Sequence, residues 1–230
     1  MGKKIYETFE DALHDLQDGA SIMIAGFGGV GSPANLMRAL QQSSAKDLTL
    51  ISNGAGNPLI EEGRVRKVIA SFTAATRPSR RSPAEELQQQ GKLIAELTPQ
   101  GTLAERIRSG GAGIPAFFTP AGVGTEIADG KEHRTFNGRT YIMEEAITAD
   151  YAFVRAWKAD TFGNLIFRRA QRNFNPIMAM AGHCTVVEVE EDIVAEGELD
   201  PDQIHTPGIF VHRLVHIPPD GLRTVGRQQA

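Results

Sequence analysis

Short runs of apolar and β-branched residues recur along the chain, and most are followed by Gly, Pro or Asn and then by an amphipathic stretch. This rhythm is typical of strand–loop–helix units. It predicts an α/β fold with an open, mostly parallel sheet and helices on both faces, in which ligands bind at the carboxyl ends of the strands. The expected strands are Ser21–Ala25, Leu48–Ser52, Lys67–Ser71, Leu93–Leu97, Tyr151–Ala156, Thr185–Val189 and Ile209–His216.

A hydroxyl side chain followed three positions later by a carboxylate can cap the free N–H groups at a helix start. Such pairs predict helix starts at Thr8 with Asp11, Ser82 with Glu85, and Thr102 with Glu105. One segment breaks the rhythm. Residues 110–130 hold six glycines and two prolines around Phe117 and Phe118, which predicts an irregular binding loop or lobe connection rather than a helix.

The glycine-rich stretch GFGGVGSP, Gly26 to Pro33, follows the strand SIMIA and precedes the amphipathic segment Ala34–Gln42. Pro33 suits the first position of a helix, and Ser32 can cap it. The segment Gly26–Gly31 would then offer exposed backbone N–H groups beside a positive helix end. That arrangement suits a phosphate, a carboxylate or an oxyanion.

Two other interpretations of this stretch stay open on the residues alone. Gly26, Gly28 and Gly31 satisfy a GxGxxG pattern, which occurs in dinucleotide-binding oxidoreductases. Against that class, Asn53 stands where such a protein needs an acidic residue, and Pro33 places the helix start after the third glycine. A strand-to-helix turn that binds nothing is the second alternative.

The composition and charge of the chain limit the partners and the cellular location to be expected. The 230 residues are 41% hydrophobic and 23% charged, as in ordinary globular proteins, and the net charge of -4 favours neither nucleic acid nor an anionic membrane as a partner. Cys184 is the one cysteine and the N-terminus has no long apolar run, so a cytoplasmic location is expected. The histidines lack ligand spacing, so no metal site is expected, and His205 and His212 should cap, pack or pair.

Several longer motifs extend over essentially the whole chain. They are DGASIMIAGFGGVGSP (18–33), GRVRKVIASF (63–72), TPQGTLAERIRSGGAGIPAFFTPAGVGT (98–125), KADTFGNL (158–165), RNFNP (172–176) and LDPDQIHTPGIFV (199–211). Together they resemble the class I coenzyme A transferases, in particular their alpha subunits. The resemblance implies a CoA-transferase-like domain over residues 1–217 with a C-terminal tail over 218–230.

The resemblance implies ping-pong transfer of CoA from succinyl-CoA to a 3-oxoacid, acetoacetate or 3-oxoadipate, as in ketone-body or aromatic-compound degradation. In the family the attacking glutamate lies in a Ser-Glu-Asn-Gly motif of a second subunit, and that tetrapeptide does not occur here. The expectation is therefore a heterotetramer with a beta subunit that carries this glutamate, no catalytic residue on this chain, and no cofactor, since the CoA thioester is a substrate.

The resemblance also implies which residues contact CoA or the substrate. Ala25 stands where the family usually has glycine, and Gly54 stands where it often has a second asparagine. The expected binding residues are Ala25, Gly26, Phe27, Gly28, Gly29, Val30, Gly31, Asn53, Gln100 and Gly101.

Other conspicuous residues have simpler interpretations. Glu144 and Glu145 are expected at the surface, and Trp157 is expected to be a buried core aromatic. The basic cluster, defined here as Lys158, Arg168, Arg169 and Arg172, is expected to be a solvated or interface surface, with binding of the CoA phosphates as the alternative.

Overall fold

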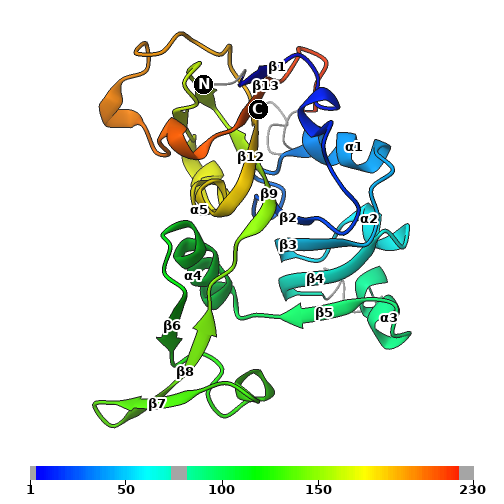
Figure 1. The fold of residues 1–230 in the computed structure, drawn as a ribbon, viewed down its shortest axis with the longest axis vertical. Helices are drawn as coiled ribbons and strands as arrows, with labels where there is room; N and C mark the ends of the chain where they lie inside the picture. The colour runs from blue at the N-terminus through cyan, green and yellow to red at the C-terminus, as the bar shows by residue number, and fades with distance from the viewer. Residues whose placement is uncertain (1–3, 74–81, 223–230) are drawn as a thin grey trace, which may run out of the picture.

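The computed structural model describes residues 4–73 and 82–222. Its central element is a sheet with the strand order β1-β13-β12-β9-β2-β3-β4-β5, in which every neighbouring pair is parallel (Figure 1). The predicted open parallel sheet is confirmed. Its strands are β1 (Ile5–Tyr6), β2 (Ser21–Ile24), β3 (Leu48–Gly54), β4 (Val65–Phe72), β5 (Ile94–Leu97), β9 (Ala149–Ala156), β12 (Gly182–Val189) and β13 (Arg213–His216).

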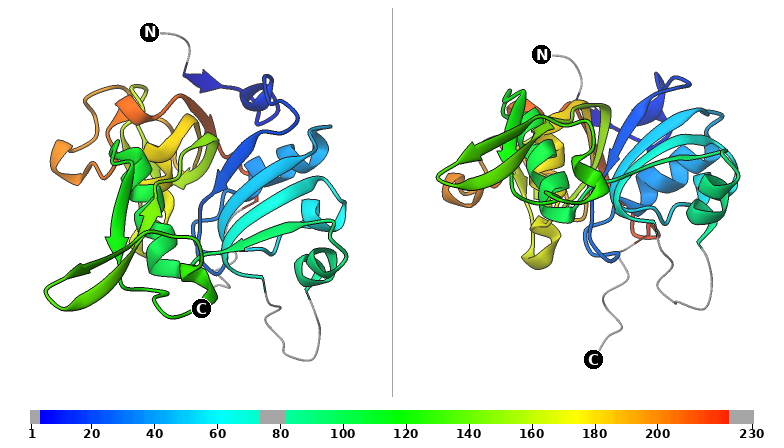
Figure 2. Two further views of the ribbon diagram at one scale, coloured as in Figure 1. Left: turned by 60° about the horizontal axis from the view of Figure 1, so that its bottom comes forward. Right: turned by 90° about the horizontal axis from the view of Figure 1, so that it is seen from below.

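Helices cover both faces of this sheet, as predicted, and each face has its own apolar cluster. Helices α1 (Ala34–Gln42), α2 (Pro58–Glu61) and α3 (Pro83–Gln89) pack on one face, where Ile22 of β2 is fully buried. Helices α4 (Gln100–Gly111) and α5 (Asn175–Ala181) pack on the other face, where the next residue of β2, Met23, is fully buried (Figure 2). Adjacent residues of a strand point to opposite faces, so a strand buried on both faces reads as a continuous apolar run.

A second, antiparallel sheet projects away from this body (Figure 1). It has the order β6-β8-β7, with β6 at Ala116–Thr119, β7 at His133–Phe136 and β8 at Arg139–Glu145. The interpretation of residues 110–130 as an irregular loop is therefore wrong in part. The segment begins with the end of α4, contains β6 and ends near a 3-10 turn at Glu126–Ala128.

The three predicted helix starts have different outcomes. Ser82 and Glu85 form the predicted reciprocal capping box at α3. The Thr8 hydroxyl accepts the backbone N–H of Asp11, but only a 3-10 turn follows, at Asp11–Leu13. The start at Thr102 is wrong, because α4 begins two residues earlier and Thr102 is buried inside it.

One predicted strand starts later than expected, and the region after β9 holds a strand pair that was not predicted. The strand expected from Ile209 begins only at Arg213, because Gly208–Phe210 forms a 3-10 turn. Two short strands, β10 (Lys158–Ala159) and β11 (Leu165–Ile166), form an additional antiparallel pair. Within residues 4–73 and 82–222, no helix is long and apolar enough to cross a membrane.

The segment predicted as a tail is described as far as Leu222. The side chain of Asn35 on α1 holds this residue twice: Leu222 N donates to Asn35 Oδ1 at 2.7 Å, and Asn35 Nδ2 donates to Leu222 O at 3.0 Å. Leu222 is thereby tied to the main sheet domain. The remainder of the predicted tail, 223–230, lies outside the described residues.

Candidate active site

The loops at the carboxyl edge of the sheet bring together two of the predicted binding residues. Asn53 lies near the end of β3, and Gln100 is the first residue of α4, directly after β5. Gln100 Nε2 donates a hydrogen bond of 2.6 Å to Asn53 Oδ1. Asn53 is only 7% exposed, whereas Gln100 is exposed. Parallel strands place their following loops at one edge, which is why the order of the elements predicts this meeting.

Both amides keep hydrogen-bonding capacity for a ligand. A primary amide has two N–H donors and one acceptor oxygen, and Gln100 gives one N–H to Asn53. In the part of the chain that the structure describes, neither Gln100 Oε1 nor Asn53 Nδ2 has a hydrogen-bond partner. The pair can therefore offer N–H groups to a carboxylate or carbonyl.

A pocket of about 270 Å³ opens beside this pair. The N-terminus of α4 borders it without a side-chain cap, so backbone N–H groups of its first turn stay available there. The pocket combines amide groups with apolar walls, and its lining holds no charged side chain among the described residues. The lining residues are Phe27, Gln100, Gly101, Ala104, Asn173, Phe174 and Ile177.

The glycine stretch forms a tight two-residue hairpin at the mouth of this pocket, called here the glycine turn (Phe27–Val30). Phe27 N donates to Val30 O and Val30 N donates to Phe27 O, both at 3.0 Å. Gly28 and Gly29 have φ angles of 55° and 84°, as the central residues of a type I′ turn require. A Cβ at either glycine would meet nothing within 4 Å. Their N–H groups have no partner among the described residues, and Phe27 lines the pocket.

The predicted role of the following helix end is wrong. Helix α1 begins at Ala34, with Pro33 as an N-cap that makes no side-chain hydrogen bond, and Ser32 does not cap it. Instead the carboxylate of Glu188, on β12, accepts the backbone N–H groups of Asn35 at 2.9 Å and Leu36 at 3.1 Å. The positive end of α1 therefore already holds an anion, and ligand binding by the glycine turn depends on the turn itself.

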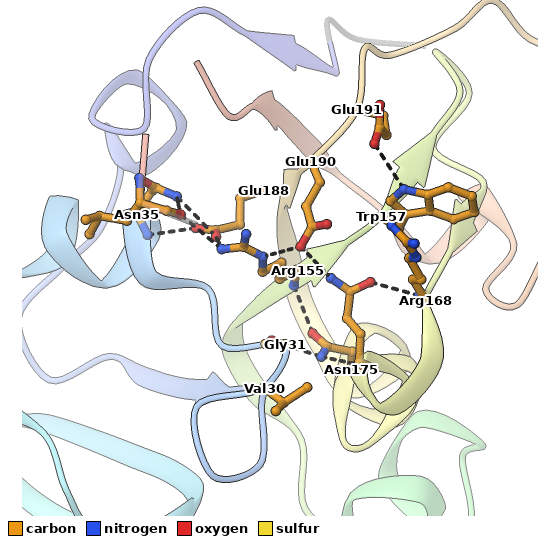
Figure 3. A network of polar contacts seen from close by, with 12 residues as sticks. Val30, Gly31, Asn35, Arg155, Trp157, Arg168, Asn175, Glu188, Glu190 and Glu191 are labelled. Carbon is orange, nitrogen blue, oxygen red and sulfur yellow. Dashed lines mark hydrogen bonds and ion pairs between the residues drawn. The ribbon is translucent and has the colours of Figure 1, made fainter. Parts of the chain in front are cut away.

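Glu188 belongs to a buried ionic network (Figure 3). Arg155 on β9, 1% exposed, donates to Glu188 Oε1 and to Glu190 Oε1, each at 2.8 Å. Burial raises the pKa of Glu188 to about 7, although Arg155 and the helix N–H groups act to lower it. Burial disfavours the charged form of an acid, whereas nearby cations and N–H donors favour it.

The network also fixes the base of the glycine turn. Asn175 is fully buried, accepts the backbone N–H of Arg155 at 2.8 Å and donates to Gly31 O at 3.0 Å (Figure 3). A Cβ at Gly31 would come within 2.8 Å of Asn175 Nδ2, so this glycine is required by packing. The RNFNP motif is visible in the sequence, but nothing in its local pattern shows that Asn175 reaches a loop 144 residues earlier.

The two departures from the family pattern have physical explanations. Ala25 is buried, and its φ is not in the positive range in which a side chain would be strained. A Cβ at Gly54 would lie 2.6 Å from the Phe72 ring. Gly54 therefore makes room for Phe72, and an asparagine at this position would collide with that ring.

The structure also tests the predictions made for Trp157, for the adjacent glutamates and for two histidines. Trp157 is only partly buried, so its predicted core position is wrong, and Lys158 Nζ and Arg168 Cζ lie 4.4 and 5.4 Å from its ring centroid. Glu144 is 2% exposed and pairs with Lys131 at 2.5 Å, so its predicted surface position is wrong, whereas the next residue, Glu145, is exposed as predicted. The prediction that the histidines cap, pack or pair is confirmed in its last form: His205 accepts the backbone N–H of Phe167, and His212 accepts that of Thr185 within β12. No metal-binding cluster occurs among residues 4–73 and 82–222.

Comparison with known proteins agrees with this architecture. The family model described as Coenzyme A transferase matches residues 6–216. The chain is 50% identical over 221 residues to a chain of the probable succinyl-CoA:3-ketoacid coenzyme A transferase of Bacillus subtilis (strain 168), covering 94% of this chain and 90% of that protein. It is 47% identical over 223 residues to a chain of the 3-oxoadipate CoA-transferase of Pseudomonas putida, covering 94% and 95%. Both relatives are named as A subunits, which correspond to the alpha type.

Among solved structures, an acyl-CoA transferase from E. coli O157:H7, in a thioester complex with CoA, superposes with a TM-score of 0.79 at 24% identity. The alignment covers 97% of this chain and 48% of that one, so this chain spans about half its length. The likeness shows the shared fold. Taken with the family match over nearly all residues, these findings establish that the chain belongs to the coenzyme A transferase family. It is a CoA-transferase enzyme.

Proposed function

We propose that this chain is the alpha subunit of a heteromeric enzyme that moves CoA from succinyl-CoA to a 3-oxoacid, acetoacetate or 3-oxoadipate. The observation that carries the proposal is the chemistry of the pocket. Its described lining offers amide groups and apolar walls, with no carboxylate, thiol or hydroxyl side chain that could attack an acyl group. A pocket of this kind can bind and orient a substrate, and the nucleophile has to come from a partner.

In this proposal a glutamate of the beta subunit initiates the reaction: it attacks the thioester carbonyl of succinyl-CoA and forms a mixed anhydride, releasing the CoA thiolate. The thiolate then attacks the glutamyl carbonyl, which gives a glutamyl-CoA thioester and free succinate. The 3-oxoacid carboxylate attacks the glutamyl carbonyl of this thioester, which forms a second mixed anhydride and releases the thiolate again. The thiolate attacks the 3-oxoacyl carbonyl of this anhydride, which gives 3-oxoacyl-CoA and restores the glutamate. Each step passes through a tetrahedral intermediate that carries a negatively charged oxygen.

The contribution of this chain would be electrostatic and positional. The N–H groups of Gly28 and Gly29 have no partner among the described residues, follow the pocket residue Phe27 directly in the chain, and could stabilise such an oxygen. Preorganised N–H donors of this kind contribute roughly 3–4 kcal/mol each to lowering an activation barrier. Asn53 and Gln100 would hold the substrate carboxylate or carbonyl through the donors that they leave free. Phe27, Val30 and Gly101 are exposed and complete the proposed binding surface, whereas Ala25, Gly26 and Gly31 are buried and support the loop that carries it.

The proposed assembly contains two copies of each subunit and works in the cytoplasm. The names of the two relatives support a partner chain, since both are called A subunits. The one cysteine leaves no internal disulfide that would require an oxidising compartment. CoA enters as a substrate, and no separate cofactor is part of the proposal.

The test is a substrate panel with the assembled enzyme. Succinyl-CoA would be incubated with acetoacetate, 3-oxoadipate and a control acid without the 3-oxo group, and the product thioesters would be separated by chromatography. The proposal expects CoA transfer to at least one 3-oxoacid. Release of free CoA without any 3-oxoacyl-CoA would contradict it.

A further inference from the structure

Asn173 lines the pocket, yet its side chain is fully engaged by the protein itself. Asn173 Nδ2 donates to Val30 O at 2.9 Å and to Ala170 O at 2.8 Å. Asn173 Oδ1 accepts the backbone N–H of Phe174 at 2.6 Å. An amide nitrogen has only two N–H groups, so no donor of Asn173 is left for a ligand. This distinguishes it from Gln100, which keeps a free N–H and a free oxygen in the same pocket.

The bond from Asn173 to Val30 holds the last residue of the glycine turn. Val30 O already accepts the N–H of Phe27 within the turn, so the Asn173 bond fills its second lone pair. Phe27 and Val30 are 47% and 38% exposed, so the turn has few other contacts. Its base is held separately, through the bond from Asn175 to Gly31.

We infer that Asn173 is a positioning residue of the transfer reaction: it holds the glycine turn at the distance from the pocket at which the N–H groups of Gly28 and Gly29 meet the reacting oxygen. This inference rests on the role proposed above for the glycine turn. Loss of the Asn173 bond leaves Gly31 held by Asn175 but allows the hairpin before it, with Gly28 and Gly29, to shift. A misplacement of about 1 Å can lower a rate by about 100-fold.

The test uses the enzyme assembled with its partner subunit. Asn173→Asp keeps the oxygen that accepts from Phe174 and removes both donors, including the one to Val30. We expect kcat to fall about 10- to 100-fold, with the KM for succinyl-CoA changed much less. The reason is that the bond from Asn173 to Val30 would position groups that stabilise the transition state rather than groups that bind the substrate. Asn57→Ala is the matched control, since it also removes a side-chain hydrogen bond, to Leu59 N, but touches neither the turn nor the pocket lined by Gln100. This control should retain its kcat.

A double-mutant cycle separates positioning from a general loss of structure. If Asn173 acts through the glycine turn, the double variant Asn173→Asp with Gly29→Ala should have a kcat only slightly below that of the less active of the two single variants. When Asn173→Asp is combined instead with Gln100→Ala, the fold-reductions in kcat of the two changes should multiply, because the proposed substrate contact of Gln100 is independent of the turn. Asn173→Ala provides a second variant if Asn173→Asp does not assemble.

The outcomes distinguish the role of Asn173 from the role of the turn. If Gly29→Ala slows transfer but both Asn173 variants retain full kcat, or if their effects multiply with that of Gly29→Ala, the positioning role is overturned and the role of the turn stands. If Gly29→Ala itself retains full kcat, the role of the turn fails, and the inference about Asn173 fails with it.

Discussion

Gln100 Nε2 lies 2.6 Å from Asn53 Oδ1, which joins the first residue of α4 to the end of β3 across 47 residues of sequence. The bond fixes the orientation of both amides and leaves one Gln100 N–H and the Asn53 amide nitrogen facing outward from the pair. The chain thus places donors at the carboxyl edge of its sheet, beside a pocket without charged side chains among the described residues.

Gln100→Ala should lower the transfer rate of the assembled enzyme about 10- to 100-fold, because a lost hydrogen bond to a charged group costs about 1.5–3 kcal/mol. The thermal midpoint should change little, since Gln100 is exposed. Gln41→Ala is the matched control, because Gln41 also uses its amide in a side-chain bond, to Glu62 on the surface. Full activity of the Gln100 variant would show that this residue does not bind the substrate.

Two glycines of the same stretch should respond in opposite ways to alanine. A Cβ at Gly29 meets nothing within 4 Å, so Gly29→Ala carries mainly the strain of a positive φ, about 1–2 kcal/mol. Its transfer rate should fall about 100- to 1000-fold, because the added methyl group occupies the open space through which the reacting oxygen would approach the N–H groups, an effect comparable to the loss of an oxyanion donor. Gly31→Ala should instead destabilise the protein by roughly 2–5 kcal/mol, because strain and the collision with Asn175 add together.

Kinetics and thermal unfolding, measured on both glycine variants in the assembled enzyme, check this contrast. If Gly29→Ala were fully active, the turn would be a structural feature only. If Gly31→Ala were as stable as the wild type, the packing of Asn175 against this loop would not be tight.

The buried pair of Arg155 and Glu188 should dominate stability. At a pH above the raised pKa of Glu188, for instance about pH 8, Glu188→Gln removes the charge that balances Arg155 and weakens the cap of α1, so it should cost about 3 kcal/mol or more. The control Glu105→Gln breaks the exposed pair with Arg108 and should cost less than about 1 kcal/mol. Urea unfolding of both variants gives the comparison, and equal losses would contradict the importance of the buried network.

A second ion pair predicts a pH dependence. The hydrogen bond from Arg213 to Asp15, at 2.7 Å, is the main cause that holds the pKa of Asp15 well below its usual range, and the Tyr151 hydroxyl adds to it. A depressed acid pKa stabilises the folded state above the unfolded pKa of about 3.9, and the contribution is lost as the pH falls below that value. The Asp15 side chain is 42% exposed, so solvent screening limits the effect to roughly 1 kcal/mol.

Asp15→Asn should therefore be less stable than the wild type at pH 7 and should approach it as the pH falls below about 4. Urea unfolding at both pH values measures the difference. A gap between the two proteins that widens in acid would show that the sign is wrong.

The sequence allowed prediction of those features that depend on neighbours along the chain or on the order of elements. The parallel sheet followed from strand–helix alternation, and the capping box of α3 lies within four residues. The meeting of Asn53 and Gln100 followed from the shared edge of parallel strands.

The features that could not be predicted depend on contacts between distant residues. Glu188 caps α1 from 153 positions away, and Asn173 reaches Val30 from 143 positions away. Strand β6 is short, and its register is set by β8, which follows about twenty residues later. Such pairings leave no local pattern, since helix and strand signals arise from residues a few positions apart.

The central claim is that this chain positions the substrate while its partner supplies the nucleophile. The most direct measurement is intact mass spectrometry of both subunits, performed once the assembled enzyme has been incubated with succinyl-CoA, with the isolated chain as the control. We predict a CoA adduct on the partner subunit, no mass change of this chain, and no CoA transfer to any 3-oxoacid by the isolated chain. A covalent CoA adduct on this chain, or turnover without the partner, would contradict the claim.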